Sequence, residues 1–402
     1  MTLIEARDRL GGRAHSFREG VFGQVIDNCQ HVLLGCCEAT IGFLAKIGSM
    51  RLVEFNGGIN FVGEKGQSLE ISSSRLPSPL HLLPSVARTR YFSAAEKLSL
   101  SRVMAHVAIN SAGDSESAGE YLESLACPRR LSERLFEPIL ASALNETART
   151  ASAKYARMVL VKSLLGEKQG WRLGVPKPPL CDVLALPAWR YLAQRGCEVR
   201  TQTRAERLNI HGDGVKSVSV DGHTLHAAAY VCAVTPDALE QLGFETPAAR
   251  RLKWNPIVSA HLFFDRPKPE FDRACVVGGP FQWVFNKTSG LAYEPTYVQA
   301  VASAAEGIVN EPKDYLVSLA LDAVSKAAPE LAGAQPVRTL MIRERHATFS
   351  TGGECDAHRP PAVTSIPNLF LAGDWTQTQW PSTLESAVRS GHAAALAVLQ
   401  RL

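Results

Sequence analysis

The sequence predicts an α/β protein in which a discontinuous, Rossmann-like nucleotide-binding domain is interrupted by an inserted α+β domain. Three observations predict this class. The chain opens with a short apolar strand that ends in an acid and leads into a Gly-Gly-Arg turn. It closes with an apolar strand, a Gly-Asp loop and a long helix. The blocks between these ends are mostly helical or mix helices with strands, as an inserted domain would.

We place the nucleotide-binding domain at residues 1–62, 196–250 and 335–402, and a substrate-binding domain at residues 63–195 and 251–334. A chain of 402 residues is long enough for two or three domains, each with its own core.

Local patterns place several elements within these domains. Asp221-Gly222 lies between two β-rich runs and predicts a hairpin with strands at 215–220 and 223–226. Ser93 is followed three residues later by Glu96, which predicts a capping box at the start of a helix. Further helices are expected at 38–47, 182–194, 314–328 and 383–402, and further strands at 197–201, 229–234, 258–264, 283–285, 297–302 and 369–372.

Composition excludes several classes of function. The net charge of +4 is small and dispersed, so nucleic acid is not an expected partner. The nine cysteines show no C-x-x-C pairs and no histidines at metal-ligand spacing, so we expect reduced thiols and no metal site. The sequence has no run of 18 apolar residues and no signal-peptide pattern at its start, and we expect a cytoplasmic protein.

The N-terminal motif has the features of a dinucleotide site. Glu5 ends the first strand, where a carboxylate can accept hydrogen bonds from both hydroxyls of a ribose. Gly11 and Gly12 permit close approach to a pyrophosphate. Arg13 supplies a charge that persists at any relevant pH.

The phosphate-binding loop that normally precedes such an acid is not in the sequence. In a dinucleotide-binding unit, a G-x-G-x-x-G loop lies about 20 residues before the ribose-binding acid, whereas Glu5 stands close to Met1. We expect that a start placed too far downstream explains the gap. The alternative is a chain that lacks the part gripping the pyrophosphate.

The C-terminal motif is the strongest signal in the chain. A buried strand would deliver Gly373 and Asp374 to the carboxyl edge of a parallel sheet, where ligands of such folds bind. Ser382 and Glu385 have the spacing of a capping box at the start of the last helix. The free N–H groups of that helix end would stabilise the negative charge that a reduced flavin gathers at its N1–C2=O edge.

Longer runs make the sequence resemble a known family. The first and last motifs, E-A-x-x-x-x-G-G-R-A and L-A-G-D-W-T, are similar to those of the FAD-dependent amine oxidase and phytoene desaturase superfamily. The runs at 27–36, 76–83, 343–349 and 373–391 are similar to those of hydroxysqualene dehydroxylases, also called squalene-associated FAD-dependent desaturases. Cys29 and Gln379 stand where that family usually has glycine.

The resemblance implies a set of FAD contacts. Glu5 would bind the ribose, Gly11, Gly12 and Arg13 would line the pyrophosphate, and the backbone of Ala205 would meet the adenine. The other end of the chain would complete the site: Gly373 and Asp374 would hold pyrophosphate and ribityl groups, and Thr383 and Leu384 would present backbone N–H groups to the flavin ring. Gln30 and His31 would lie near the isoalloxazine as candidate catalytic residues; the alternative for His31 is a structural histidine whose hydrogen bonds are satisfied within the fold.

The resemblance also implies an activity in squalene and hopanoid biosynthesis. Hydroxysqualene, an allylic C30 alcohol, would be reduced to squalene with loss of water. The hydride would come from reduced FAD, and His31, or a water that it holds, would protonate the leaving hydroxyl. The alternatives are a carotenoid-type desaturase, an amine oxidase with Trp375 and Trp380 as an aromatic cage, or a non-catalytic remnant that no longer binds FAD.

A substrate this apolar favours contact with a membrane. We expect its tunnel to be lined by aliphatic and aromatic side chains. The segment 77–92 contains Leu80, Leu82, Leu83 and Val86, with basic and aromatic residues at its end. One expectation is therefore peripheral contact of this segment with the inner face of the cytoplasmic membrane. The alternative is a proline-rich segment that packs on the second domain.

Overall fold

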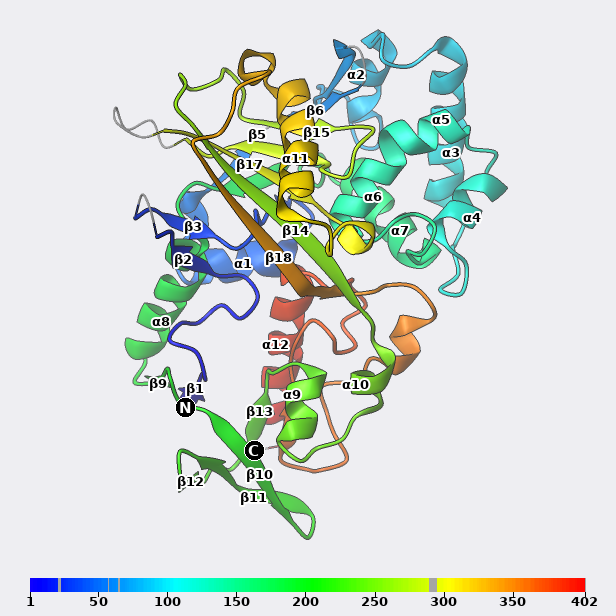
Figure 1. Cartoon of the computed structure of the whole chain (residues 1–402). Helices are drawn as coiled ribbons and strands as arrows, with labels where there is room; N and C mark the ends of the chain where they lie inside the picture. Colours follow the sequence, from blue (N-terminus) through cyan, green and yellow to red (C-terminus); the bar gives the residue numbers. More distant parts are fainter. Residues whose placement is uncertain (21–22, 57, 64–65, 289–294, 402) are drawn as a thin grey trace.

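The computed structural model describes residues 1–20, 23–56, 58–63, 66–288 and 295–401. Figure 1 shows an upper lobe, built on a large sheet with a group of helices beside it, and a lower lobe that holds both termini. The predicted α/β class, with lobes built from segments far apart in sequence, is confirmed.

The upper lobe is organised by one seven-stranded sheet. Neighbouring strands are antiparallel except for one parallel pair in the second half of the sheet. In order across the sheet the strands are β18 (Arg338–Phe349), β14 (Trp254–Phe264), β17 (Thr296–Ala302), β16 (Trp283–Asn286), β15 (Arg273–Val276), β6 (Ile59–Val62) and β7 (Ser68–Ile71), and β15–β6 is the parallel pair.

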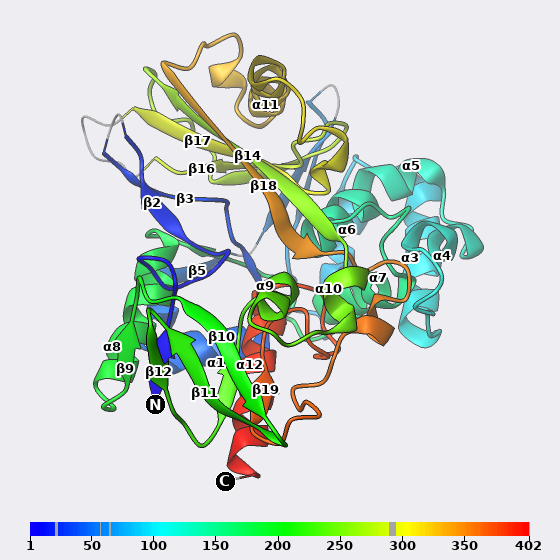
Figure 2. The ribbon, with the colours of Figure 1, turned by 60° about the horizontal axis from the view of Figure 1, so that its bottom comes forward.

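The two faces of this sheet differ in chemistry because side chains alternate along each strand. One face is aliphatic and packs beneath helix α11 (Lys313–Ala327), with Val258, Leu262 and Val298 in its core. The other face carries Ser259, His261 and further polar and aromatic residues. Figure 2 shows α11 on the first side of the sheet and the hairpin of β2 (Ser16–Arg18) and β3 (Val25–Asp27) on the second.

The lower lobe contains two short parallel pairs. β1 (Thr2–Ile4) pairs with β9 (Glu198–Arg200), and β13 (Tyr230–Cys232) pairs with β19 (Leu369–Leu371). The long helix α12 (Leu384–Leu399) packs against β19 and against α1 (Glu38–Lys46). The Gly-Gly-Arg turn and the Gly-Asp loop of the two sequence motifs follow the carboxyl ends of β1 and β19.

The predicted hairpin is confirmed. β10 (Ala205–His211), β11 (Gly214–Val220) and β12 (His223–Leu225) form an antiparallel sheet at the bottom of the molecule. Asp221 and Gly222 have φ values of 47° and 75°. Positive φ at both central residues is the geometry that twists in the same sense as the two strands.

The group of helices beside the sheet supplies much of a hydrophobic core that is separate from the core beneath α11. Ser93 caps α3 with the predicted capping box, and Ser117 caps α4 in the same way. The helices of this group are α2 (Leu83–Arg88), α3 (Ala94–Ile109), α4 (Ala118–Ser124), α5 (Arg129–Leu131), α6 (Glu137–Leu144) and α7 (Ala153–Leu160).

The remaining elements complete the two lobes. The helix expected at 182–194 is a π-helical turn, Cys181–Ala185, followed by α8 (Leu186–Ala193). The other α-helices and strands of the described chain are β4 (Leu33–Leu34), β5 (Val53–Asn56), β8 (Leu173–Pro176), α9 (Pro236–Gln241) and α10 (Pro247–Arg251). Among the described residues, the structure has no helix that is long and apolar enough to cross a membrane.

The proposed domain boundaries stay a prediction. The segments 1–62 and 335–402, which we assigned to the nucleotide-binding domain, each contribute a strand, β6 and β18, to the seven-stranded sheet. These two strands link the lobes covalently, so residues of the sheet are held close to the two terminal motifs.

Candidate flavin site

The acid of the first motif lies at the edge of a parallel pair. Glu5 follows β1, and its carboxylate accepts a hydrogen bond from the backbone N–H of Arg7 (2.8 Å). The backbone N–H of Thr203 donates to the carbonyl oxygen of Glu5 (2.9 Å). Ala205 begins β10 two residues further on, so the structure brings together the two residues expected to meet the adenosine.

The Gly-Gly turn needs its glycines for different reasons. Gly11 has φ +115°, and a Cβ there would lie 2.4 Å from the carbonyl oxygen of Ala14. Gly12 has φ +58° with open space around it. The first glycine therefore allows the turn to close, and the second leaves the backbone bare on its exposed side.

Arg13, which follows this turn, meets the C-terminal motif. Its guanidinium forms an ion pair with the carboxylate of Asp374, which is 5% exposed. It also donates to the carbonyl oxygen of Ala347 (2.8 Å) and lies 5.3 Å and 5.5 Å from the ring centroids of Trp254 and Phe349. Strands β14 and β18 and the loop after β19, all distant from Arg13 in sequence, thus fix the position of one permanent cation.

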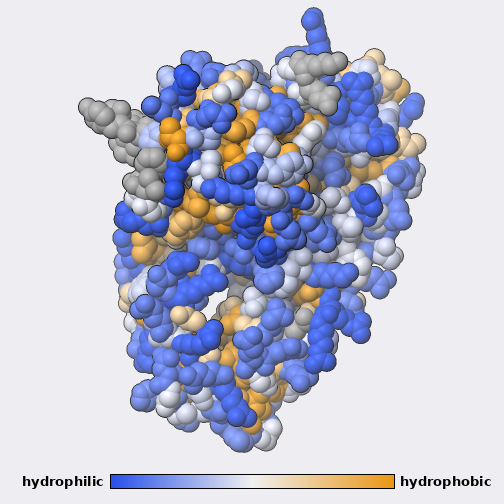
Figure 3. All heavy atoms as spheres, in the orientation of Figure 1, coloured by the Kyte–Doolittle hydropathy of each residue, from blue (hydrophilic) through white to orange (hydrophobic). Residues whose placement is uncertain are grey.

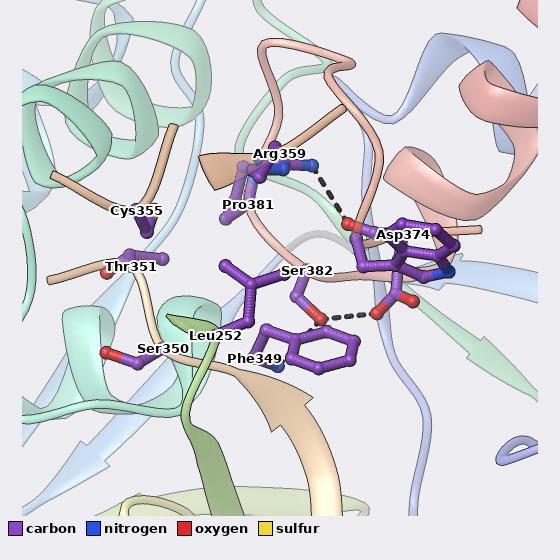
Figure 4. Close-up of a pocket in the computed structure, with 10 residues that line it drawn as sticks. Leu252, Phe349, Ser350, Thr351, Cys355, Arg359, Asp374, Pro381 and Ser382 are labelled. Atoms are coloured by element: carbon purple, nitrogen blue, oxygen red, sulfur yellow. Dashed lines mark hydrogen bonds between the residues drawn. The ribbon is translucent and has the colours of Figure 1, made fainter. Parts of the chain in front are cut away.

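The other carboxylate oxygen of Asp374 accepts a hydrogen bond from the hydroxyl of Ser382 (Figure 4). The hydroxyl oxygen of Ser382 in turn accepts from the backbone N–H of Phe349 (3.0 Å). Gly373 has φ +130°, and a Cβ there would lie 2.5 Å from the indole nitrogen of Trp375. The loop after β19 can therefore take this path only with glycine at that position.

The capping box predicted for Ser382 and Glu385 is wrong. Thr383 is the N-cap of α12, and its hydroxyl accepts from the backbone N–H of Ser386 (3.4 Å). Ser382 is engaged with Asp374 instead, because the loop delivers it to that carboxylate. Leu384 opens the first turn, where backbone N–H groups have no acceptor within the helix.

The carboxylate of Glu385 binds the N-terminus of a different helix, α1. Its buried carboxylate accepts hydrogen bonds from the backbone N–H groups of Ala39 (3.0 Å) and Thr40 (2.8 Å) and from the Thr40 hydroxyl (2.9 Å). It also pairs with Arg389 (2.8 Å). A carboxylate at the N-terminus of α1 is favoured by the unpaired N–H groups there, so this side chain fastens α12 to α1.

We expect Glu385→Ala to lower the free energy of unfolding by about 2–4 kcal/mol, because it leaves buried hydrogen-bond donors and the charge of Arg389 without their acceptor. Glu385→Gln keeps an acceptor oxygen and should lose about half as much. Urea denaturation of both variants measures the difference. An alanine variant as stable as the wild type would show that the carboxylate does not join the helices.

Arg359 organises the same loop, and nothing in our sequence reasoning indicated it. The side chain is 6% exposed, and Figure 4 shows it pointing toward Asp374. Its guanidinium donates hydrogen bonds to the backbone carbonyl oxygens of Asp374 (2.8 Å) and Trp380 (2.7 Å). Its other acceptors are Tyr155 Oη, Asp356 Oδ1, Thr378 Oγ1 and Ser386 Oγ.

A third segment, 27–31, lies against the Gly-Gly-Arg turn. Asn28 donates through its amide to the carbonyl oxygen of Arg13 (2.8 Å) and accepts from the backbone N–H of His15 (3.3 Å). Asn28 belongs to a run that carries the family resemblance, but its spacing alone did not mark it as a binding residue. Its contacts hold Gln30 and His31 near the site.

The protonation of His31 follows from a hydrogen bond of its imidazole ring. Its Nδ1 lies 3.1 Å from the carbonyl oxygen of Cys29, which can only accept, so Nδ1 carries the hydrogen. Burial lowers the pKa of His31. A neutral ring with Nδ1 protonated leaves Nε2 as a hydrogen-bond acceptor.

Unpaired buried atoms and the shape of the surface indicate from which side a ligand would enter the site. Within the described chain, the atoms of this region that are buried without a hydrogen-bond partner include His15 Nδ1 and Gln30 Oε1. The cavity drawn in Figure 4 is lined by Asp374, Arg359 and Ser382, among other residues. It has a volume of about 10 Å³ and holds at most one water molecule. Figure 3 shows the molecular surface hollowed between the N-terminal segment and α12. A ligand would therefore approach from the Arg13 side.

This chemistry fits a flavin dinucleotide. A guanidinium and a bare glycine turn suit the pyrophosphate, and a helix N-terminus suits the electron-rich edge of the ring. Gln379 has φ +57° at a position where the family resemblance leads us to expect glycine, so this loop takes the left-handed conformation without the residue that favours it. Fold and site together define a flavin-dependent oxidoreductase.

The comparison with known families agrees. The model of the family described as flavin containing amine oxidoreductase matches residues 1–399. The chain therefore belongs to this family. As predicted from the motifs, it is similar to the hydroxysqualene dehydroxylase of Rhodopseudomonas palustris, with 31% identity over 98% of this chain and 91% of that protein. The hydroxysqualene dehydroxylase of Sinorhizobium fredii is 29% identical over the same shares.

More distant relatives place the fold. The 15-cis-phytoene desaturase of Glycine max is 23% identical over 99% of this chain and 75% of that protein. The solved structure of wild-type putrescine oxidase bound to putrescine superimposes with a TM-score of 0.72 at 15% identity, covering 99% of this chain and 93% of that one. At this identity the likeness shows the fold alone.

Proposed function

We propose that the protein binds FAD and uses it to reduce hydroxysqualene to squalene with loss of water, a step that serves hopanoid biosynthesis. The observation that carries the cofactor is the meeting of Arg13, Asp374 and the N-terminus of α12. The substrate rests on relatives named hydroxysqualene dehydroxylase that cover 98% of the chain.

The proposed contacts run along the cofactor from one end to the other. Glu5 would bind the adenosine ribose, with the backbone of Ala205 near the adenine. Gly11, Gly12 and Arg13 would line the pyrophosphate. The last part of the site comes from the C-terminus: Gly373 and Asp374 at the ribityl end, and the backbone N–H groups of Thr383 and Leu384 at the ring.

A bound reduced flavin supplies a hydride at N5, and the carbinol carbon of the substrate would accept it while its oxygen leaves as water. The side chains must therefore hold the hydroxyl and provide a proton. A neutral His31 offers an acceptor at Nε2, which suits a water held beside the substrate better than direct donation of a proton. Gln30 has an unpartnered amide oxygen in the same segment, within the described chain.

The amine oxidase alternative finds little support in the two tryptophans that were considered for an aromatic cage. The indole of Trp375 is 1% exposed and donates to the carbonyl oxygen of Val234 (2.8 Å). The ring of Trp380 already carries the guanidinium of Arg389 at 4.6 Å. Neither ring is free to surround an amine.

The test is product analysis with three candidate substrates. The protein, with FAD reduced by dithionite under argon, is incubated with hydroxysqualene, and with oxidised FAD it is incubated with phytoene or putrescine. We expect squalene from the first mixture and no turnover in the others. Conversion of phytoene or putrescine without squalene formation would reject the proposal.

The cavity beside the helical group does not match the apolar tunnel expected for this substrate. It has a volume of about 590 Å³ and lies between α5, α6 and the ends of β6 and β15. Its lining includes the charged residues Arg130, Glu133, Arg134 and Glu137. A hydrocarbon chain would leave these groups poorly solvated, so the tunnel stays a prediction.

We propose further that the segment 77–92 touches the cytoplasmic face of a membrane, but through fewer residues than the sequence indicated. Leu80 and Leu83 are 46% and 43% exposed, whereas Leu82, Tyr91 and Phe92 are buried in the core. The exposed pair has basic neighbours in Arg75, Arg88 and Arg90. Exposed leucines with cations nearby in the sequence suit an anionic lipid surface.

Replacing both Leu80 and Leu83 by Ser is expected to weaken binding to phosphatidylglycerol vesicles about tenfold, since each loses apolar contact with the acyl chains. Flotation on a sucrose gradient measures the bound fraction. Leu186→Ser removes a leucine of similar exposure (42%) from α8 and is the matched control. Equal flotation of the double variant and the control would reject this contact.

A further inference from the structure

A cluster of four polar side chains lies on the face of the seven-stranded sheet opposite α11. Ser259 and His261 come from β14, and Tyr297 and Gln299 come from β17. His261 stands directly across from Gln299, and Tyr297 lies two residues before Gln299 on the same face. All four are buried, with exposures of 0–6%.

The cluster is a continuous chain of hydrogen bonds. The Nδ1 of His261 lies 2.6 Å from Tyr297 Oη, and its Nε2 lies 3.3 Å from Ser259 Oγ. The amide of Gln299 reaches the same hydroxyl of Ser259 at 2.8 Å. Ser259 is therefore the end of the chain where two partners converge.

The protonation of the two ring systems sets the direction of the chain. Burial, followed by the charge of Lys287, lowers the pKa of His261 to about 3, so the imidazole is neutral. Burial raises the pKa of Tyr297 well above its usual value, so its hydroxyl keeps its hydrogen. When Tyr297 donates to Nδ1, Nε2 donates to Ser259, and the Ser259 hydroxyl has a hydrogen left to give.

The amide of Gln299 is incompletely satisfied. Its Oε1 is buried and has no hydrogen-bond partner among the described residues. Whichever way the amide is turned, one of its two polar groups lacks a partner, because the Ser259 hydroxyl takes the other. Leaving a buried polar group unpaired costs free energy, so this amide group favours binding of a partner that can complete its hydrogen bonds.

The cluster borders the segment that carries Gln30 and His31. Cys29 packs with Phe285 and Val301 in one buried group. Phe285 is the residue directly across from Gln299, and Val301 is directly across from Ser259. The free groups of Ser259 and Gln299 therefore lie beside the segment that we place near the flavin ring.

We propose that Ser259 and Gln299 bind the hydroxyl group of the substrate alcohol, with His261 and Tyr297 as positioning residues behind them. An alcohol is both a donor and an acceptor, and it matches a site with one free hydroxyl hydrogen and one free amide group. Ser259 donates to the substrate oxygen, and the Gln299 oxygen accepts from the substrate O–H. This inference rests on the proposed function and identifies the residues that make the same site specific for an alcohol.

The test compares an alcohol with the corresponding hydrocarbon. Affinities for hydroxysqualene and squalene are measured by tryptophan fluorescence titration of the flavin-loaded protein in detergent. We expect the wild type to bind the alcohol about tenfold more tightly, the preference that one or two good hydrogen bonds provide. Gln299→Leu and Ser259→Ala should reduce this ratio to near one, and Tyr297→Phe should reduce it about threefold.

Thr296→Val is the matched control, because it removes a buried hydrogen bond (Thr296 Oγ1 to the carbonyl oxygen of Arg266, 2.7 Å) on the opposite face of the same strand. It should lower thermal stability and leave the ratio unchanged. A ratio that stays near ten in Gln299→Leu and Ser259→Ala, or a wild type that does not prefer the alcohol, overturns the inference. Squalene formation by the wild type with an unchanged ratio would reject this inference alone, whereas absence of squalene formation rejects the proposed function.

Discussion

Replacing Arg359 by methionine is expected to lower the free energy of unfolding by about 3–5 kcal/mol, the usual cost of breaking a buried charge network from one side. The guanidinium joins the helical group, through Tyr155, to the loop that carries Asp374. Its removal leaves backbone carbonyl oxygens of that loop without donors in a dry interior. Urea denaturation with fluorescence detection measures the loss.

Arg401→Met provides the control for this experiment. Arg401 is exposed; its side chain donates to the carbonyl oxygen of Pro367 (2.9 Å) and lies 5.9 Å from the centroid of the Phe370 ring. Its replacement should change stability by no more than about 0.5 kcal/mol. If the two variants lose equal stability, Arg359 does not hold the loop.

Replacing Arg13 by methionine is expected to weaken flavin binding about 100-fold, the upper range for losing charge-assisted hydrogen bonds to an anion. The change also leaves the buried carboxylate of Asp374 without its cation. Arg13→Lys should recover little, because an ammonium cannot donate to Ala347, pair with Asp374 and stack over Trp254 at once. Retention of flavin on gel filtration, followed by its absorbance, measures the effect.

Arg9→Met is the matched control, since Arg9 lies in the same loop and pairs with Asp8 at the surface. A surface pair of this kind contributes little, so flavin retention should not change. Equal loss of flavin in both variants would mean that general positive charge, rather than the placement of Arg13, holds the cofactor.

The two ends of the flavin site could be predicted because each is a local pattern. Glu5, the Gly-Gly-Arg turn and the Gly-Asp loop each follow a short strand, and such strands place their last residues at a ligand-binding edge. Sequence spacing could not show that Arg13 and Asp374 form an ion pair across 361 positions. The inference that both motifs serve one ligand came from the resemblance.

The parts that sequence reasoning missed depend on long-range packing. Glu385 has the spacing of a capping residue for its own helix, yet its partners are 345 and 346 positions away at the start of α1. Arg359 lies in a loop without periodicity, so no local signal distinguishes it from a surface arginine. The cluster around His261 depends on the register between β14 and β17, because a slip by one residue would turn these side chains toward α11.

The central claim is that this chain holds a flavin between its two terminal motifs, and the most direct test is the visible absorption spectrum after incubation with FAD and removal of the excess. The account predicts a yellow protein with about one FAD per chain released on denaturation, and a nearly colourless Arg13→Met variant prepared in the same way. A folded wild-type protein that stays colourless after incubation with FAD would contradict it.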